Sequence, residues 1–78
     1  MAETLTLSMG QRKKLFRCYR RHPDPVLRWR AHVVLLLADG HTWAAIGAAL
    51  FCSTSTISRW KERFEDGGMD ALLGRPRG

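Results

Sequence analysis

A run of hydroxyl-bearing residues between positions 51 and 60, FCSTSTISRW, is the part of the chain whose side chains could do chemistry. Five of its first eight residues are Ser or Thr, with Cys52 before them and Arg59 after them. These residues could act as nucleophiles, or they could exchange hydrogen bonds with another molecule. A nucleophile needs a base within hydrogen-bond reach and a third group that orients the base. No glycine-flanked turn surrounds Cys52 and no particular His pairs with it, so we predict no catalytic residue and no enzyme activity for this chain.

The Cys and His residues do not have the spacing of a metal site. Cys18 and Cys52 form no C-x-x-C pair, and His22, His32 and His41 lie ten and nine residues apart. A structural zinc ion needs four converging ligands. We therefore expect no metal and no cofactor, and we expect two reduced, buried thiols of a kind that suits the cytoplasm.

The charge of the chain indicates a polyanionic partner. Its 78 residues carry a formal net charge of +6, with a sequence pI near 10.4. Nucleic acid is the first expectation and an anionic membrane surface the second. The longest apolar run, Val33–Ala38, is far shorter than the roughly 20 residues that span a bilayer, and the first ten residues lack the pattern of a signal peptide. We expect one small domain without a membrane segment.

Capping residues and apolar spacing predict four helices that position the 51–60 run. Ser8 with Gln11 three residues later has the spacing of a capping box, and Asp24 precedes a proline suited to a first helical position. Thr42 and Ser53 cap the next two helices. The predicted helices are 9–21, 25–38, 43–50 and 54–65. Residues 66–68 (DGG) close the last helix, 69–73 form a helical turn at best, and 74–78 are a basic Gly/Pro linker or tail.

Each predicted helix has an apolar stripe that we expect to face a common core. The expected stripes are Leu15, Phe16 and Tyr19 in the first helix; Leu27, Ala31, Val34, Leu35 and Ala38 in the second; Ile46, Gly47 and Leu50 in the third; and Ile57, Trp60 and Phe64 in the fourth. The fold class is therefore all-α, and the Ser/Thr run is the polar face of a helix rather than a linker.

A helix, a tight turn and a second helix with a small, polar start are what recognition of a DNA groove requires. The first turns of the second helix must enter a major groove about 12 Å wide and offer hydrogen bonds to base edges. The candidates for base contact are Thr54, Ser55, Ser58, Arg59 and Glu62. The candidates for contact with the DNA backbone are Thr42, Ser53, Thr56, Lys61 and Arg63, together with Arg12 and Lys13 from the basic face of the first helix. That basic face could equally be a solvated surface.

The segment HTWAAIGAALFCSTSTISRWKERFEDGGMDALLGRPRG resembles the helix-turn-helix of mariner-type bacterial insertion-sequence transposases, the insertion sequence 630 family. RWRAHVVLLLADG and LTLS resemble the family's preceding helix and entry, so the resemblance covers nearly the whole chain. It implies a homeodomain-like three-helix core with an extra N-terminal helix, within a DNA-binding domain at residues 1–73. It also implies recognition of terminal inverted repeats in double-stranded DNA by a cytoplasmic, nucleoid-associated protein. The cutting chemistry would lie in a separate domain, and either that domain or a second DNA-binding unit would begin near Gly78.

Three positions depart from the family's pattern. Gly47 stands where Ala is usual and is expected to loosen its helix slightly, and Cys52 replaces a Val of similar size. Phe51 replaces the Gly of the turn. A bulky residue in a left-handed conformation is strained by about 1 kcal/mol or more, so either the turn is reshaped or burial of Phe51 offsets the strain.

The sequence leaves two other functions open. A stand-alone helix-turn-helix transcription regulator would have the same helices and would use a homodimer to recognise a palindrome. A small helical adaptor would dock its basic helix on an acidic protein. The tail GRPRG also resembles an AT-hook, whose arginines lie in a narrow minor groove, and its candidates are Arg75 and Arg77.

Overall fold

All four helices begin at the capping residues that the sequence indicates. The computed structural model of the protein describes residues 5–74. Its helices are α1 (Met9–Arg21), α2 (Pro25–Ala38), α3 (Trp43–Leu50) and α4 (Thr54–Leu72). Ser8 and Gln11 form the reciprocal capping box, and the side chains of Asp24, Thr42 and Ser53 each accept a hydrogen bond from a backbone N–H of the helix that follows. The predicted bounds of α1, α2 and α3 are confirmed.

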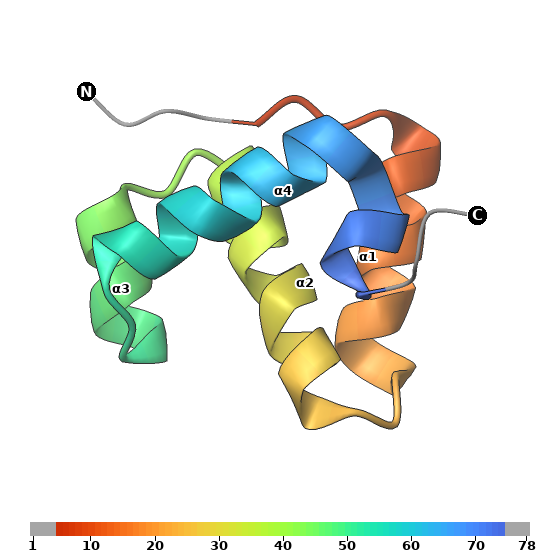
Figure 1. Cartoon of the computed structure of the whole chain (residues 1–78), viewed down its shortest axis with the longest axis horizontal. Coiled ribbons are helices and arrows are strands. Elements are labelled where there is room, and N and C mark those ends of the chain that lie inside the picture. Colours follow the sequence, from red (N-terminus) through yellow and green to blue (C-terminus); the bar gives the residue numbers. More distant parts are fainter. Residues whose placement is uncertain (1–4, 75–78) are drawn as a thin grey trace.

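Helix α2 is the centre of the fold. Helix α1 packs along one side of it, and α3 and α4 pack on it and on each other, so that α1 and α3 lie at opposite ends of the molecule (Figure 1). Helix α2 also supplies more buried core residues than any other helix, and Ala31, Val33, Val34 and Leu37 are completely buried. The described residues contain helices and no strand, which confirms the all-α class. No helix within residues 5–74 is long and apolar enough to cross a lipid bilayer.

The fourth helix is interrupted at the DGG segment, and one helical turn follows the interruption. It continues to Leu72 across a break at Gly68, whose backbone (φ 63°, ψ −149°) is not helical. The DGG segment therefore ends the regular helix, as predicted, and residues 69–72 form the single helical turn that the sequence allowed at 69–73. Leu72 is fully buried, and its carbonyl oxygen accepts a hydrogen bond of 3.1 Å from Nη1 of Arg30. Burial of an apolar side chain and this bond to α2 hold the last turn in place.

The buried stripe of α1 also differs from the predicted one. Leu15 and Cys18 face the core, whereas Phe16 and Tyr19 remain 49% and 37% exposed. Helix α1 packs chiefly on α2, so only a narrow stripe of it is covered, and Phe16 lies about 100° around the helix from Leu15. The ring of Tyr19 lies on the edge of this contact, with its centroid 4.6 Å from that of His32.

Candidate nucleic-acid interface

The turn between α3 and α4 brings the two helices close together. The N–H of Cys52 donates to the carbonyl oxygen of Gly47 over 3.1 Å. A Cβ atom on residue 47 would lie only 2.8 Å from the carbonyl oxygen of Cys52, so the turn needs a glycine here. The expectation that Gly47 merely loosens α3 is thus incomplete, because the missing side chain is what allows the chain to approach so closely.

Phe51 keeps the left-handed backbone of the turn and gains no burial. Its φ of 55° and ψ of 49° are left-handed α values, and its side chain is 95% exposed. The structure therefore satisfies neither of the two alternatives, a reshaped turn or a buried ring. The strain of a non-glycine residue in this conformation, about 1–2 kcal/mol, is not offset by packing of the ring.

The orientation of α4 is set by three large side chains on its inner face. Ile57, Trp60 and Phe64 are all buried, as predicted. The Trp60 ring also contacts two guanidinium groups, with Cζ of Arg30 at 4.2 Å and Cζ of Arg63 at 5.1 Å from its centroid. The contact with Arg30 connects α4 to α2. These contacts leave the opposite face of α4, with its Ser, Thr and Arg side chains, directed outward.

All five predicted base-contact residues border one open hollow of about 450 Å³. Its lining consists of Trp43, Thr54, Ser55, Ser58, Arg59 and Glu62. Trp43, in the first turn of α3, was not among the candidates. Its place directly after the Thr42 cap was the only sequence feature that could have indicated it. Trp43 borders the hollow, and its buried indole Nε1 has no hydrogen-bond partner among residues 5–74.

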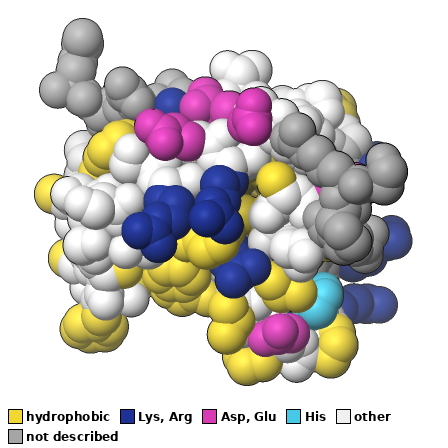
Figure 2. All heavy atoms as spheres, viewed as in Figure 1, with side chains coloured by type: hydrophobic (Ala, Val, Ile, Leu, Met, Phe, Trp, Pro, Cys, Tyr) yellow, Lys and Arg dark blue, Asp and Glu magenta, His cyan; other side chains and the backbone are white. Residues whose placement is uncertain are grey.

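The charge along α4 favours an anion at its beginning. No acidic residue occurs in this helix before Glu62, whereas four lie between Glu62 and Asp70. The unpaired N–H groups of the first turn add partial positive charge. In the view of Figure 2, acidic side chains gather along the upper edge of the face, above a group of Lys and Arg side chains. A polyanion is therefore best accommodated at the N-terminal half of α4.

The predicted phosphate contacts of α3 and α4 do not line this hollow, and they differ in whether their side chains are already engaged. Thr42 and Ser53 use their hydroxyl oxygens as caps, accepting from N–H groups at 3.0 and 3.2 Å, and Ser53 Oγ lies 3.0 Å from Thr56 Oγ1. Arg63 is exposed. Lys61 forms an ion pair of 2.9 Å with Glu65, and its side chain is only 12% exposed. The capping hydroxyls and Arg63 are thus better placed to reach a phosphate than Lys61.

The remaining candidates do not border the hollow. Arg12 forms an ion pair with Asp39, and Lys13 lines a separate hollow on α1. Arg75 and Arg77 lie outside the residues that the structure describes. The contacts predicted for α1 and for the tail therefore stay predictions.

The two thiols are poor nucleophiles in this fold. Burial raises the pKa of both Cys18 and Cys52, which keeps them protonated at neutral pH. Residues 5–74 contain no cluster of three or more His, Cys, Asp or Glu side chains that could hold a metal ion.

The family of the domain follows from residues 24–73, which match the family model of the homeodomain-like domain. The match begins at the cap of α2 and includes the whole of α4, and it covers more than half of the chain. The chain therefore belongs to the homeodomain-like helix-turn-helix family, with α2 to α4 as its three-helix core and α1 as an addition. No curated protein and no solved structure gives a significant match to the chain.

Proposed function

We propose that this chain binds double-stranded DNA sequence-specifically, with the first turns of α4 in the major groove and α3 braced across the backbone. The observation that carries the proposal is the hollow at the start of α4, where the five candidate base-contact residues meet Trp43. Small hydroxyl side chains let a helix approach base edges, and a long Arg can form two hydrogen bonds with guanine. Membership of the helix-turn-helix family supports the same arrangement.

Arg59 is proposed as the main specificity residue. It is exposed, it lies one position before the buried Trp60, and it borders the hollow. Because Trp60 fixes the rotation of α4, the Arg59 side chain is directed away from the core. Arg63, one turn further along, is exposed but does not border the hollow, so it is proposed as a phosphate contact.

The finer part of the proposal is that the DNA site is the terminal inverted repeat of a mobile element, recognised for an insertion-sequence transposase. The resemblance to that family supports it, since Thr56, Ile57, Arg59 and Trp60 match the motif. The inward and outward positions of these side chains fit a recognition helix. The proposal assigns DNA recognition to this chain and no catalytic step.

Selection of binding sites from random duplex DNA tests the proposal. The wild-type chain should select a defined motif. Arg59→Ala should lose the preference at one position of that motif, at a cost of about 1–3 kcal/mol. Arg63→Ala is the matched control, because it removes an equal charge one turn away and should weaken binding to all sequences alike. Sequence-specific recognition by α4 is refuted if no motif emerges. It is also refuted if both variants weaken binding and both still select the wild-type motif.

The form of the selected motif separates the transposase from a stand-alone regulator. A single asymmetric site bound by one copy is expected for an inverted repeat. A palindrome bound by an obligate dimer, detected by light scattering, would favour the regulator.

A further inference from the structure

Helix α1 carries more Lys and Arg residues than any other helix of the protein. This helix carries six of the chain's thirteen Lys and Arg residues and no acidic residue. Lys13, Arg17 and Arg21 form a row at four-residue spacing, and like charges at this spacing destabilise a helix. The ion pair of Arg12 with Asp39 connects one of the cations to the end of α2. Asp70 of α4 lines a second hollow with Lys14, Arg17 and Arg21, so an acidic residue lies along one edge of the outward face of α1.

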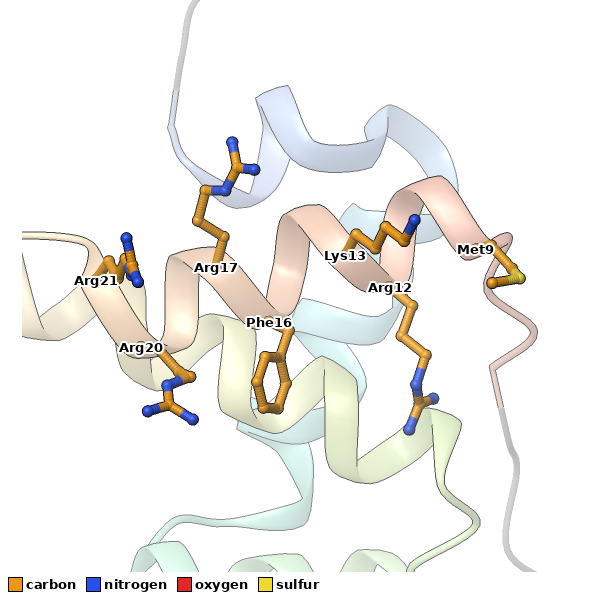
Figure 3. A pocket seen from close by; sticks show the side chains of 7 residues that line it. All are labelled: Met9, Arg12, Lys13, Phe16, Arg17, Arg20 and Arg21. Atoms are coloured by element: carbon orange, nitrogen blue, oxygen red, sulfur yellow. The ribbon is translucent and has the colours of Figure 1, made fainter.

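Apolar side chains are exposed between these cations. Met9 and Phe16 are 77% and 49% exposed, and both line a hollow of about 610 Å³ on the surface of α1. Figure 3 shows Phe16 between Arg12 and Arg20 on one side of the helix. The guanidinium Cζ of Arg20 lies 5.7 Å from the centroid of the Phe16 ring. The face therefore has an apolar centre and a cationic rim.

This face is separate from the proposed DNA-binding surface. The hollow on α1 shares no lining residue with the hollow at the start of α4. Helix α1 packs chiefly on α2, and it lies outside the residues that match the homeodomain-like domain. A partner could occupy it while α4 is bound to DNA.

We infer that the outward face of α1 is a docking site for an acidic amphipathic segment of another protein. Apolar side chains of that segment cover Phe16 and Met9, and its carboxylates pair with the surrounding Lys and Arg residues. Such a partner removes the like-charge repulsion along α1 and takes the exposed ring out of water. A helix in a groove with flanking charges is a common mode of peptide recognition.

Three other occupants fit the face less well. DNA phosphates would pair with the cations but leave Phe16 exposed, since phosphate contact requires no apolar centre. A bilayer would need the apolar side of α1, yet Leu15 and Cys18 are buried in the core. A second copy of this chain would bring two net charges of +6 together.

Fluorescence anisotropy with two labelled peptides tests the inference. The first probe is an amphipathic peptide of about 15 residues with Leu on one face and Glu on both flanks, and the second has Ser in place of Leu. The protein should bind the Leu/Glu peptide about tenfold more tightly than the Ser/Glu peptide. Equal affinity for the two peptides, or no binding of either at millimolar concentration, would overturn the proposal.

Variants locate the binding to α1. Phe16→Ser should weaken binding of the Leu/Glu peptide about fivefold, whereas Val26→Ser should leave it unchanged. Val26 is the matched control, because it is apolar, 53% exposed and at the start of α2, outside the hollow. Arg17→Glu should abolish peptide binding, and the α1 variants should bind the selected DNA duplex like the wild type. Equal losses from Phe16→Ser and Val26→Ser would contradict docking on this face.

The other occupants give different results with the same proteins. If Arg17→Glu weakens duplex binding as much as Arg59→Ala does, α1 contacts the DNA backbone and the proposal is overturned. Cosedimentation with vesicles of phosphatidylserine and phosphatidylcholine that is lost in Phe16→Ser would identify a membrane surface instead. A concentration-dependent dimer that Phe16→Ser dissociates would identify a second copy. Because duplex binding is measured in parallel, failure here is distinguishable from failure of the DNA-binding proposal.

Discussion

Replacing Phe51 by Gly should make the protein more stable. Phe51 is the only non-glycine residue with positive φ among residues 5–74, and its ring is 95% exposed. Glycine relieves a strain of about 1–2 kcal/mol at a left-handed position. It also gives the unfolded chain more freedom, which costs about 0.5–1 kcal/mol. Since almost no buried area is lost with the ring, the expected net gain is about 0.5–1 kcal/mol, or about 2–8 °C in melting temperature for a domain of this size.

The control for this prediction is Phe51→Ala. Alanine removes the ring but keeps the Cβ atom that makes the left-handed conformation unfavourable. Its stability should stay within about 0.5 kcal/mol of the wild type. Far-UV circular dichroism measured during heating and in urea gives both values, and an unchanged urea m-value shows that the difference lies in the folded state.

Two outcomes would refute the reasoning about Phe51. If Gly and Ala give equal stability, the left-handed backbone is not the source of strain. If both variants are clearly less stable than the wild type, the Phe51 ring makes a stabilising contact, and the premise that the exposed ring contributes nothing is wrong.

Four further changes test other parts of the fold and the interface. Gly47→Ala should lower stability by up to about 2 kcal/mol, because its Cβ would lie 2.8 Å from the carbonyl oxygen of Cys52. The control is Gly10→Ala, which should instead raise stability by up to about 1 kcal/mol because a Cβ has room there. If urea unfolding shows the same change in stability for both variants, the close approach of residues 47 and 52 is contradicted. Leu72→Ala should cost about 2–5 kcal/mol in urea unfolding, whereas a loss below about 0.5 kcal/mol would show that the last turn is peripheral. Burial lowers the pKa of His32, so its contribution to stability is present above the unfolded-state pKa of about 6.5 and is lost as the pH falls through the lower folded-state pKa. The melting temperature of the wild type should therefore fall between about pH 7 and pH 5, and that of His32→Gln should fall less. Parallel plots of melting temperature against pH for the two proteins would refute the role of His32. Duplex affinity should fall with salt at a log–log slope of about −4 to −5 if about five phosphates are neutralised, and a flat slope would contradict the electrostatic contribution.

The sequence predicted which residues of α4 point outward, because this depends only on how that one helix is rotated. The spacing of Ile57, Trp60 and Phe64 defines the inner face of α4, and the Ser, Thr and Arg residues that remain must point outward. The contribution of Trp43 was not predictable, because it depends on how α3 crosses α4. The turn that sets this crossing contains a left-handed Phe51 that the sequence pattern disfavours.

The sequence by itself determined where the helices begin. Ser8, Asp24, Thr42 and Ser53 each bond to a backbone N–H two or three residues away, so the information needed is entirely local. Only the tertiary structure decided how the helical turn after Gly68 is held and which side of α1 is covered. Leu72 is held by burial and by a hydrogen bond from Arg30, 42 residues earlier in the chain, and Phe16 is exposed because α1 packs chiefly on one neighbour. Burial depends on contacts with residues that are distant in sequence, and the sequence pattern of one or two helical turns gives no information about those contacts.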